Sequence, residues 1–142
     1  MKNVGQMLTE KEHKLLAISP EATVFEALQK MAKANVGALV VLDGTKLAGI
    51  FTERDYARKI ILFGKASKDT LVREIMTDKV LCVRLEQSVE QCMALMTAKR
   101  IRHLPVLDHK QVVGLISIGD VVKEVISEQQ FIIAQLESYI HQ

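Results

Sequence analysis

Gly49-Ile-Phe-Thr-Glu-Arg-Asp55 is the stretch that decides the fold, because the chain repeats its pattern 65 residues later as Gly114-Leu-Ile-Ser-Ile-Gly-Asp120. The same offset, without an insertion, relates a series of identical residues that precede the two stretches. These pairs are Glu21/Glu86, Val24/Val89, Met31/Met96, Leu39/Leu104, Val41/Val106, Leu42/Leu107 and Asp43/Asp108. Such self-similarity marks an internal repeat, which has to be identified before any local structure is assigned. The chain therefore contains two copies of one unit, and a ligand site in one copy predicts a twin in the other.

The composition is that of an ordinary globular domain. The 142 residues suffice for one buried core, and the contents of 49% hydrophobic and 25% charged residues are typical of such proteins. A net charge of +2 without a basic run gives no electrostatic basis for binding nucleic acid or an anionic membrane. The apolar runs are too short to span a bilayer, and the first residues lack the apolar run of a secretory signal. Cys82 and Cys92 are too few for a disulfide framework, so we expect a cytoplasmic protein.

Each repeat opens with a strand and a helix. Short apolar runs at Lys14–Ile18 and Val80–Leu85 predict the strands. Thr23 and Ser88 each begin a capping box, in which a hydroxyl and a Glu or Gln three residues later satisfy N–H groups of the first helical turn. The residues that follow place apolar side chains at i, i+3, i+4 and i+7, which predicts one buried helix face. They are Val24, Ala27, Leu28 and Met31 in the first repeat and Val89, Cys92, Met93 and Met96 in the second.

A hairpin and a second helix complete each repeat. Asp43-Gly44 is a strong hairpin signal between two apolar runs, and the second copy has a matching pair of runs. The four predicted strands are Ala38–Leu42, Leu47–Phe51, His103–Leu107 and Val112–Ile116. Pro105 lacks an N–H, so we expect it at a sheet edge or at a strand start. With a helix beginning at Thr52 or Ser117, each unit has the order β-α-β-β-α, which is too small to close its own core. We therefore expect an α/β (α+β) fold in which two repeats share one core about a pseudo-two-fold axis.

The organisation along the chain follows from the repeat. Val4–Thr9 matches Val72–Thr77, so we interpret both as short helices that lead into the repeats. The predicted divisions are an N-terminal lead-in helix (1–13), the first repeat (14–64), a linker with a short helix (65–78), the second repeat (79–127) and a C-terminal helix (128–142).

The paired Gly-x-x-Thr/Ser-x-x-Asp motifs are the strongest candidates for chemistry. As helix N-caps, Thr52 and Ser117 need no further function to explain them. However, a buried strand that feeds a helix N-terminus presents free N–H groups and the positive end of the helix dipole, which suits a phosphate. Asp55 and Asp120, one turn later, can accept two hydroxyls of a ribose. Capping and binding are compatible uses of the same side chains.

These features resemble a tandem pair of CBS domains, often called a Bateman module. The resemblance rests on the repeat, the β-α-β-β-α order and the two motifs, and it extends from Val4 to about Ile126. It implies a disc-like assembly with two clefts for adenosine compounds such as AMP, ADP, ATP, S-adenosylmethionine or NAD. It also implies that Asp55 and Asp120 hold ribose hydroxyls while Thr52 and Ser117 contact ribose or phosphate.

In this family each cleft combines the motif of one repeat with strand starts of the other. The resemblance thus predicts an Asp55 cleft of Ile50, Thr52, Arg54, Asp55, Leu81, Ile101, Arg102, His103 and Pro105. It predicts an Asp120 cleft of Leu16, Val36, Gly37, Ala38, Leu115, Ser117 and Asp120. Arg54, Arg102 and His103 suit a phosphate in the Asp55 cleft. The other cleft has Gly37, Ala38 and Gly119 at the equivalent positions, so we expect a smaller or less charged ligand there, or part of a longer one.

We therefore expect a stand-alone, bacterial-type regulatory pair that senses an adenine nucleotide (AMP, ADP, ATP or NAD) and acts on an unknown target protein. It would need no catalytic residue, catalytic cofactor or metal. One alternative is a nucleotide hydrolase or transferase using Asp55 or Asp120, although no paired carboxylate, metal cluster or activated nucleophile accompanies either. A second alternative is a nucleic-acid-binding protein, against which the aromatic content of 4% argues. Its candidate contacts would be Arg54, Arg58, Arg100 and Arg102.

A C-terminal apolar stripe predicts assembly. Its members alternate steps of four and three along the helix, with Gln129 as a polar interruption. They are Val122, Ile126, Ile133, Leu136 and Ile140. Such a stripe requires burial, either on its own module or on a second chain. We expect a homodimer in which these helices contribute, and the resemblance adds helix faces near Tyr56 and Ile60.

Overall fold

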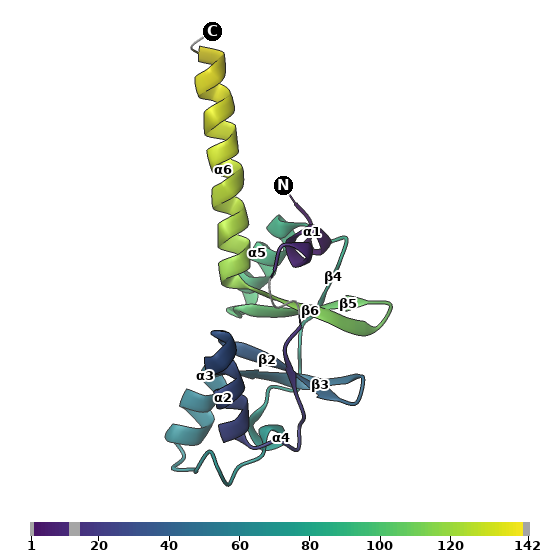
Figure 1. Ribbon diagram of the computed structural model, residues 1–142, viewed down its shortest axis with the longest axis vertical. Helices are drawn as coiled ribbons and strands as arrows, with labels where there is room; N and C mark the ends of the chain where they lie inside the picture. The colour runs from purple at the N-terminus through teal and green to yellow at the C-terminus, as the bar shows by residue number, and fades with distance from the viewer. Residues whose placement is uncertain (1, 12–14, 141–142) are drawn as a thin grey trace.

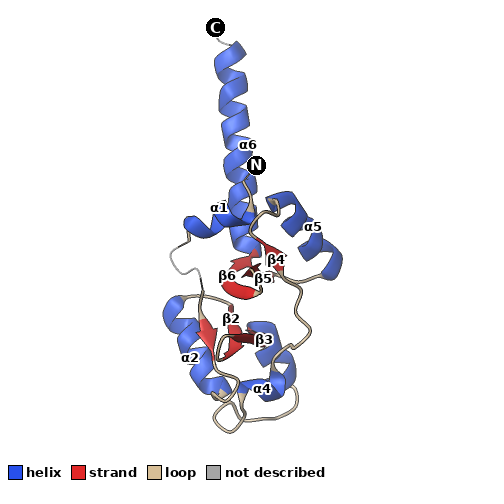
Figure 2. Cartoon of the chain, turned by 90° about the vertical axis from the view of Figure 1, so that its right-hand side faces the viewer, coloured by secondary structure: helices blue, strands red, loops and turns tan. Residues whose placement is uncertain are grey.

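The computed structural model describes residues 2–11 and 15–140. Two three-stranded sheets lie one above the other, with helices on their outer sides, and the C-terminal helix projects away from both (Figures 1 and 2). The strand order is β1-β2-β3 in one sheet and β4-β5-β6 in the other. In both, the first pair is parallel and the second antiparallel. The predicted mixed fold of two β-α-β-β-α repeats is confirmed.

The elements follow the repeat closely. The first half contains β1 (Ala17–Ile18), α2 (Val24–Ala34), β2 (Ala38–Asp43), β3 (Lys46–Thr52), α3 (Glu53–Asp55) and η1 (Tyr56–Ile61). The second half contains β4 (Val83–Arg84), α5 (Val89–Lys99), β5 (His103–Asp108), β6 (Gln111–Ser117) and α6 (Ile118–Ile140). Two short helices, α1 (Val4–Thr9) and α4 (Val72–Ile75), precede the halves. The opening strands are shorter than predicted, and Lys14 lies outside the described residues.

The predicted capping boxes differ between the halves. Ser88 Oγ accepts the Gln91 N–H at 3.1 Å, and Gln91 Oε1 accepts the Ser88 N–H at 2.9 Å, which completes the box. Thr23 Oγ1 likewise accepts the Glu26 N–H at 3.1 Å. However, the Glu26 carboxylate accepts a hydrogen bond from the Thr23 hydroxyl and not from the Thr23 backbone N–H. Only half of the predicted box is therefore present at the start of α2.

Three apolar clusters replace the single shared core that the sequence predicted. Side chains alternate across β2 because successive residues of a strand face opposite sides. Leu39 and Val41 enter the core of the first half, whereas Ala38 and Val40 face the second half. The second half has a separate core of its own. Strand β2 is thus buried on both faces, and the layer that joins the halves is completed by Ile50 and Leu115.

The lead-in helices cross between the halves. Helix α1 precedes the first repeat but packs on the second, where Val4 N–H donates to the Gln87 carbonyl at 2.8 Å. Helix α4 precedes the second repeat but packs on the first, where Val72 N–H donates to the Ala22 carbonyl at 2.8 Å. The two contacts are equivalent by the repeat. As a result, α1 and the strand that follows it in the chain, β1, lie on different halves (Figure 1).

Pro105 lies in the middle of its sheet, so the expectation of an edge or a strand start is wrong. It is the third residue of β5, and β5 lies between β4 and β6. Its counterpart Val40 donates an N–H to the Leu16 carbonyl at 3.1 Å. Pro105 has no N–H to offer Leu81 at the matching position, and β4 pairs only from Val83 onward. The proline is tolerated because the parallel ladder begins after it.

The second helices also differ. Helix α6 remains α-helical through Ile140, whereas α3 gives way after three residues to the π-helix η1. Ile60 of η1 is 2% exposed and packs in the first-half core, and the dimer face expected near Tyr56 and Ile60 remains a prediction. The exposed apolar side chains here are instead Ile61, Leu62 and Phe63.

Candidate functional site

Two clefts lie at the junction of the halves. The Asp120 cleft has a volume of about 660 Å³, and the Asp55 cleft has a volume of about 400 Å³. Both volumes fall in the range of small-molecule sites. Gly37 and His103 line both clefts, so they form part of the wall between them.

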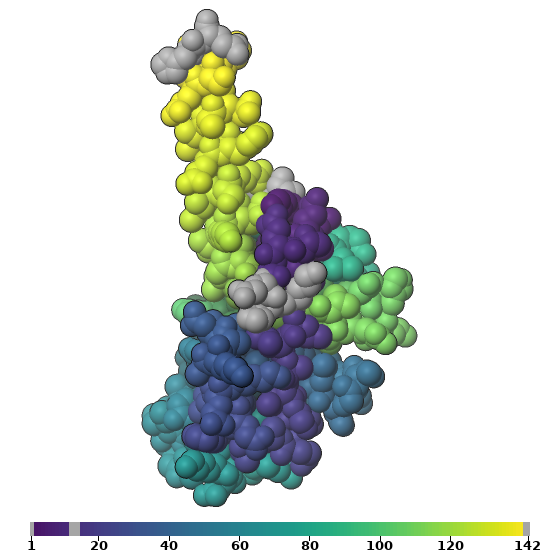
Figure 3. Space-filling view, viewed as in Figure 1, coloured from purple at the N-terminus to yellow at the C-terminus, as the bar shows by residue number. Residues whose placement is uncertain are grey.

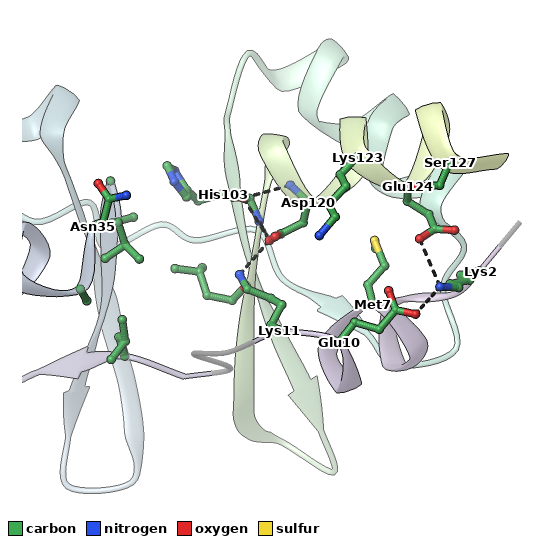
Figure 4. Close-up of a pocket in the computed structure, with 17 residues that line it drawn as sticks. Lys2, Met7, Glu10, Lys11, Asn35, His103, Asp120, Lys123, Glu124 and Ser127 are labelled. Carbon is green, nitrogen blue, oxygen red and sulfur yellow. Dashed lines mark hydrogen bonds and ion pairs between the residues drawn. The ribbon is translucent and has the colours of Figure 1, made fainter. Parts of the chain in front are cut away.

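The Asp120 cleft brings together every residue predicted for it. Its walls include Leu16, Val36, Gly37, Ala38, Leu115, Ser117 and Asp120. Figure 4 shows Asp120 at the start of α6, facing the segment that follows α1. The apolar residues come from the first half and from β6, whereas the motif residues come from the second half. The cleft therefore has the crossed composition that the resemblance implies, and the binding role of these residues remains a prediction.

The Asp55 cleft brings together most of its predicted residues. Ile50, Thr52, Arg54, Asp55, Ile101, Arg102 and His103 line it. Leu81 and Pro105 do not, which corrects the prediction. Leu81 is 42% exposed because Pro105 cannot hold it in the sheet as Val40 holds Leu16. Glu53 and Thr77 line this cleft although the prediction omitted them.

Both motifs form complete helix caps. The Thr or Ser and the Asp of each motif therefore also have the N-capping role that the pattern predicts. In the second half, Asp120 Oδ2 accepts the Ser117 N–H at 2.8 Å and the Ser117 hydroxyl at 3.0 Å. In the first half, Asp55 Oδ2 accepts the Thr52 N–H at 3.0 Å and the Thr52 hydroxyl at 3.2 Å. Each carboxylate is thereby fixed at its cleft.

The second oxygen of Asp55 is occupied by the first half itself. Oδ1 accepts the Thr77 hydroxyl at 3.1 Å and lies 3.2 Å from Lys59 Nζ. Thr77 also exchanges two backbone hydrogen bonds of 2.9 Å with Ile50. Asp55 is consequently only 5% exposed. Its carboxylate is enclosed by fixed partners.

Asp120 also pairs with a lysine, but this lysine comes from the N-terminal segment and not from the helix that carries the carboxylate. Lys11 Nζ lies 2.7 Å from Asp120 Oδ2 and donates to the Leu115 carbonyl at 2.7 Å (Figure 4). The counterpart of Lys59 in this half is Glu124, whose charge cannot pair with a carboxylate. The side chains of Lys11 and Asp120 are 22% and 24% exposed. This carboxylate is thus more accessible than that of Asp55.

Lysines that the sequence reasoning missed line the Asp120 cleft. They are Lys2, Lys11 and Lys123, which come from the N-terminal segment and from α6. Lys2 pairs with Glu10 and lies 3.6 Å from Glu124, and both carboxylates also line the cleft. The expectation of a smaller or less charged ligand, or of part of a longer one, remains a prediction. It rested on positions related by the 65-residue offset and did not consider lysines that reach the cleft from outside the two repeats.

His103 is neutral at physiological pH. Its burial, with smaller effects of Lys11 and Arg102, lowers the pKa of the imidazole to about 4, although the Asp120 carboxylate acts in the opposite direction. A neutral imidazole can both donate and accept a hydrogen bond. Because His103 lines both clefts, it offers this capacity to either.

The chemical groups at and near the clefts can be stated for the described residues. The part of the chain that the structure describes holds no group of three or more potential metal ligands. Burial raises the pKa of the Cys82 and Cys92 thiols, which disfavours a nucleophilic thiolate. Among the described helices, none combines the length and apolar character needed to cross a membrane. What the clefts do provide is apolar walls, hydroxyl-accepting carboxylates and cations.

A family model described as "CBS domain" matches residues 4–62 and 72–127, and the chain belongs to this family. The matched ranges contain both motifs and both lead-in helices. The family is regulatory in character, as the resemblance implied.

Individual proteins support the assignment. The chain is 48% identical over 123 residues to "CBS domain-containing protein CBSX3, mitochondrial" from Arabidopsis thaliana, covering 83% of this chain but only 60% of that protein. It is 54% identical, with a TM-score of 0.84, to the solved CBS domain structure NE2398, covering 88% of this chain and 98% of that one. The CBS domain pair of protein MJ0100 was solved in complex with 5′-methylthioadenosine and S-adenosyl-L-methionine. It has 25% identity and a TM-score of 0.77, covering 87% of this chain and 99% of that one.

Proposed function

We propose that this protein is a non-catalytic sensor that binds an adenosine-containing ligand (AMP, ADP, ATP or NAD) in the clefts between its repeats. The observation that carries the proposal is the Asp120 cleft, where a carboxylate lies beside apolar walls and lysines. The carboxylate would accept the ribose hydroxyls, the apolar residues would contact the base, and the lysines would face the phosphates. The two ligands of the MJ0100 complex are adenosine compounds, which supports the same class of ligand here.

The proposal includes a cytoplasmic location and an unidentified target protein. Both cysteines are free thiols, which suits a reducing compartment. A signal would reach the target through a change in the surface around the occupied cleft or in α6, whose first turn carries Asp120.

We further propose that α6 pairs with α6 of a second copy. On the face in view, α6 stands clear of the rest of the molecule (Figure 3). Its stripe is exposed at every member, from Val122 at 44% to Ile140 at 73%. A long exposed apolar face usually marks an interface, and steps of four and three are those of a two-helix seam. Gln129 would set the register of the pair.

Light scattering tests this pairing. The intact protein is expected to have the mass of a dimer, and a chain ending at Glu128 is expected to have the mass of a monomer. A truncated chain that remains dimeric with an unchanged dissociation constant would show that α6 does not hold the dimer together.

Thermal unfolding with nucleotides tests the ligand class. A ligand present at about a hundred times its dissociation constant adds ~2.7 kcal/mol to the apparent stability. We expect adenine nucleotides to raise the melting temperature more than guanine nucleotides do, and we expect no product in the recovered ligand. Turnover of ATP or NAD would instead favour a hydrolase or transferase. Unmoved melting temperatures with AMP, ADP, ATP and NAD would remove the support for the sensor.

A further inference from the structure

The ammonium of Lys11 makes two contacts in the Asp120 cleft. They are equivalent to the two contacts that the N–H and hydroxyl of Thr77 make in the Asp55 cleft. In the first half, the Ile50 carbonyl accepts the Thr77 N–H at 2.9 Å, and Asp55 accepts the Thr77 hydroxyl at 3.1 Å. In the second half, the Leu115 carbonyl is the equivalent of the Ile50 carbonyl and accepts from Lys11 Nζ at 2.7 Å. The same ammonium lies 2.7 Å from Asp120. A mobile side chain thus occupies a place that backbone and hydroxyl groups occupy in the other half.

The two arrangements differ in how easily they exchange partners. Thr77 is tied by a reciprocal pair of backbone hydrogen bonds, and its movement would break both. Lys11 is attached through a flexible four-carbon stem, and its ammonium can rotate to a new acceptor without moving the backbone. The side chains of Lys11 and Asp120 are 22% and 24% exposed, and an ion pair this exposed contributes little to stability. Breaking it when a ligand binds therefore costs little free energy.

The surroundings supply further cations for an anionic group of a ligand. Lys2 and Lys123 line the same cleft, where Lys2 already pairs with Glu10 and lies 3.6 Å from Glu124. Asp120 retains its contacts with the Ser117 N–H and hydroxyl when Lys11 leaves. The carboxylate therefore stays in place while its ion pair is exchanged.

We propose that Lys11 is a displaceable counter-ion that sets the ligand preference of the Asp120 cleft. In the empty cleft it neutralises Asp120. When a nucleotide binds, the two ribose hydroxyls take its place at Asp120, and its ammonium pairs with the phosphate. The cleft consequently favours a ligand that has both a vicinal diol and an anionic group over a nucleoside that has only the diol. This inference rests on the proposed function, because it requires that an adenosine compound binds the cleft.

The test compares AMP with adenosine by ¹H–¹⁵N NMR titration, following the amides of Ser117 and Asp120 so that this cleft reports alone. In Lys11→Met, adenosine no longer competes with the ammonium and is expected to bind about two- to five-fold more tightly, the size of a partly exposed ion pair. AMP loses a charged partner and is expected to bind about fivefold more weakly or worse. The ratio of AMP affinity to adenosine affinity should therefore fall at least about tenfold.

Two matched variants serve as controls. Lys11→Arg keeps the charge and should keep the affinity ratio within about twofold, since a guanidinium can make the same exchange. Lys46→Met removes a lysine from the first position of β3, outside the residues that line either cleft, and should leave the ratio unchanged. An unchanged ratio in Lys11→Met, or an equal fall in Lys46→Met, would overturn the role of Lys11 while leaving the sensor intact. If AMP and adenosine move no amide of the wild-type protein at millimolar concentration, this inference fails, and if ADP, ATP and NAD move none either, the proposed function fails with it.

Discussion

The two clefts arise from the same repeat but hold their carboxylates in different ways. Asp55 is enclosed by groups of its own half and is 5% exposed. Asp120 has the same cap but takes its remaining partner from the N-terminal segment. The repeat therefore determines where each carboxylate lies, and the segments outside the repeat determine how available it is. Three comparisons between variants test this contrast, in order of decreasing expected effect.

The largest difference is expected between Asp55→Ala and Asp120→Ala. Removing Asp55 takes away one helix cap, the acceptor of the half-buried Thr77 hydroxyl and the ion pair of Lys59, which keeps only its contact with the Ile75 carbonyl at 3.0 Å. The loss should lower the free energy of unfolding by ~2–3 kcal/mol. Removing Asp120 frees only the partly exposed Lys11 and one cap, for a loss of ~1 kcal/mol or less. Urea unfolding monitored by circular dichroism measures both. Equal losses for the two variants would contradict the difference in enclosure.

A smaller effect is expected from a methyl group at the wall of the Asp55 cleft. A Cβ on Gly49 would lie 2.6 Å from the Thr77 carbonyl oxygen and 3.0 Å from Met76 Sδ, so the backbone bridge between Thr77 and Ile50 would have to shift. We expect Gly49→Ala to lower the free energy of unfolding by ~1–3 kcal/mol.

Gly119→Ala is the matched control in the second motif. A Cβ there meets only Ser117 Oγ at 3.6 Å, within the first turn of α6. Alanine in an exposed helical position should be neutral or stabilising by up to ~1 kcal/mol. If Gly49→Ala is as well tolerated as Gly119→Ala in the same urea experiment, the close approach of Thr77 does not fix the first cleft.

The smallest effect is expected from pH at the wall between the clefts. Because the pKa of His103 is about 4 in the folded protein and its ordinary value is 6.5, the unfolded chain binds more protons between these values. The contribution of His103 to stability is therefore complete above pH 6.5 and is lost as the pH falls toward 4. Relative to His103→Gln, the wild type should lose ~1–2 kcal/mol over this range, after allowance for the exposed part of the ring. If the difference in the free energy of unfolding between the wild type and His103→Gln stays constant from pH 7 to 4, the lowered pKa of His103 is contradicted.

The repeat made much of this structure predictable. One offset located both hairpins and both motif caps, and the resemblance to the family supplied the predicted residues of the Asp120 cleft. It succeeded because positions related by an internal symmetry receive the same neighbours. The same reasoning failed at Pro105, where a single missing N–H delays the parallel ladder and leaves Leu81 exposed.

Features that break the symmetry were not predictable in this way. The crossing of α1 and α4 leaves no mark on their own sequences, since each helix would have a similar pattern on either half. The position of Lys11 at Asp120 depends on that crossing. The change from α3 to the π-helix η1 likewise has no counterpart in the second repeat, where α6 continues regularly.

The most direct test of the sensor is isothermal titration calorimetry with AMP, comparing the wild type with Asp120→Ala and with the Asp55→Ala/Asp120→Ala double variant. We predict that the wild type binds AMP, that Asp120→Ala loses the site in the larger cleft, and that the double variant loses the remaining binding while its far-ultraviolet circular dichroism spectrum stays native. Unchanged stoichiometry and affinity in a folded double variant would contradict the account.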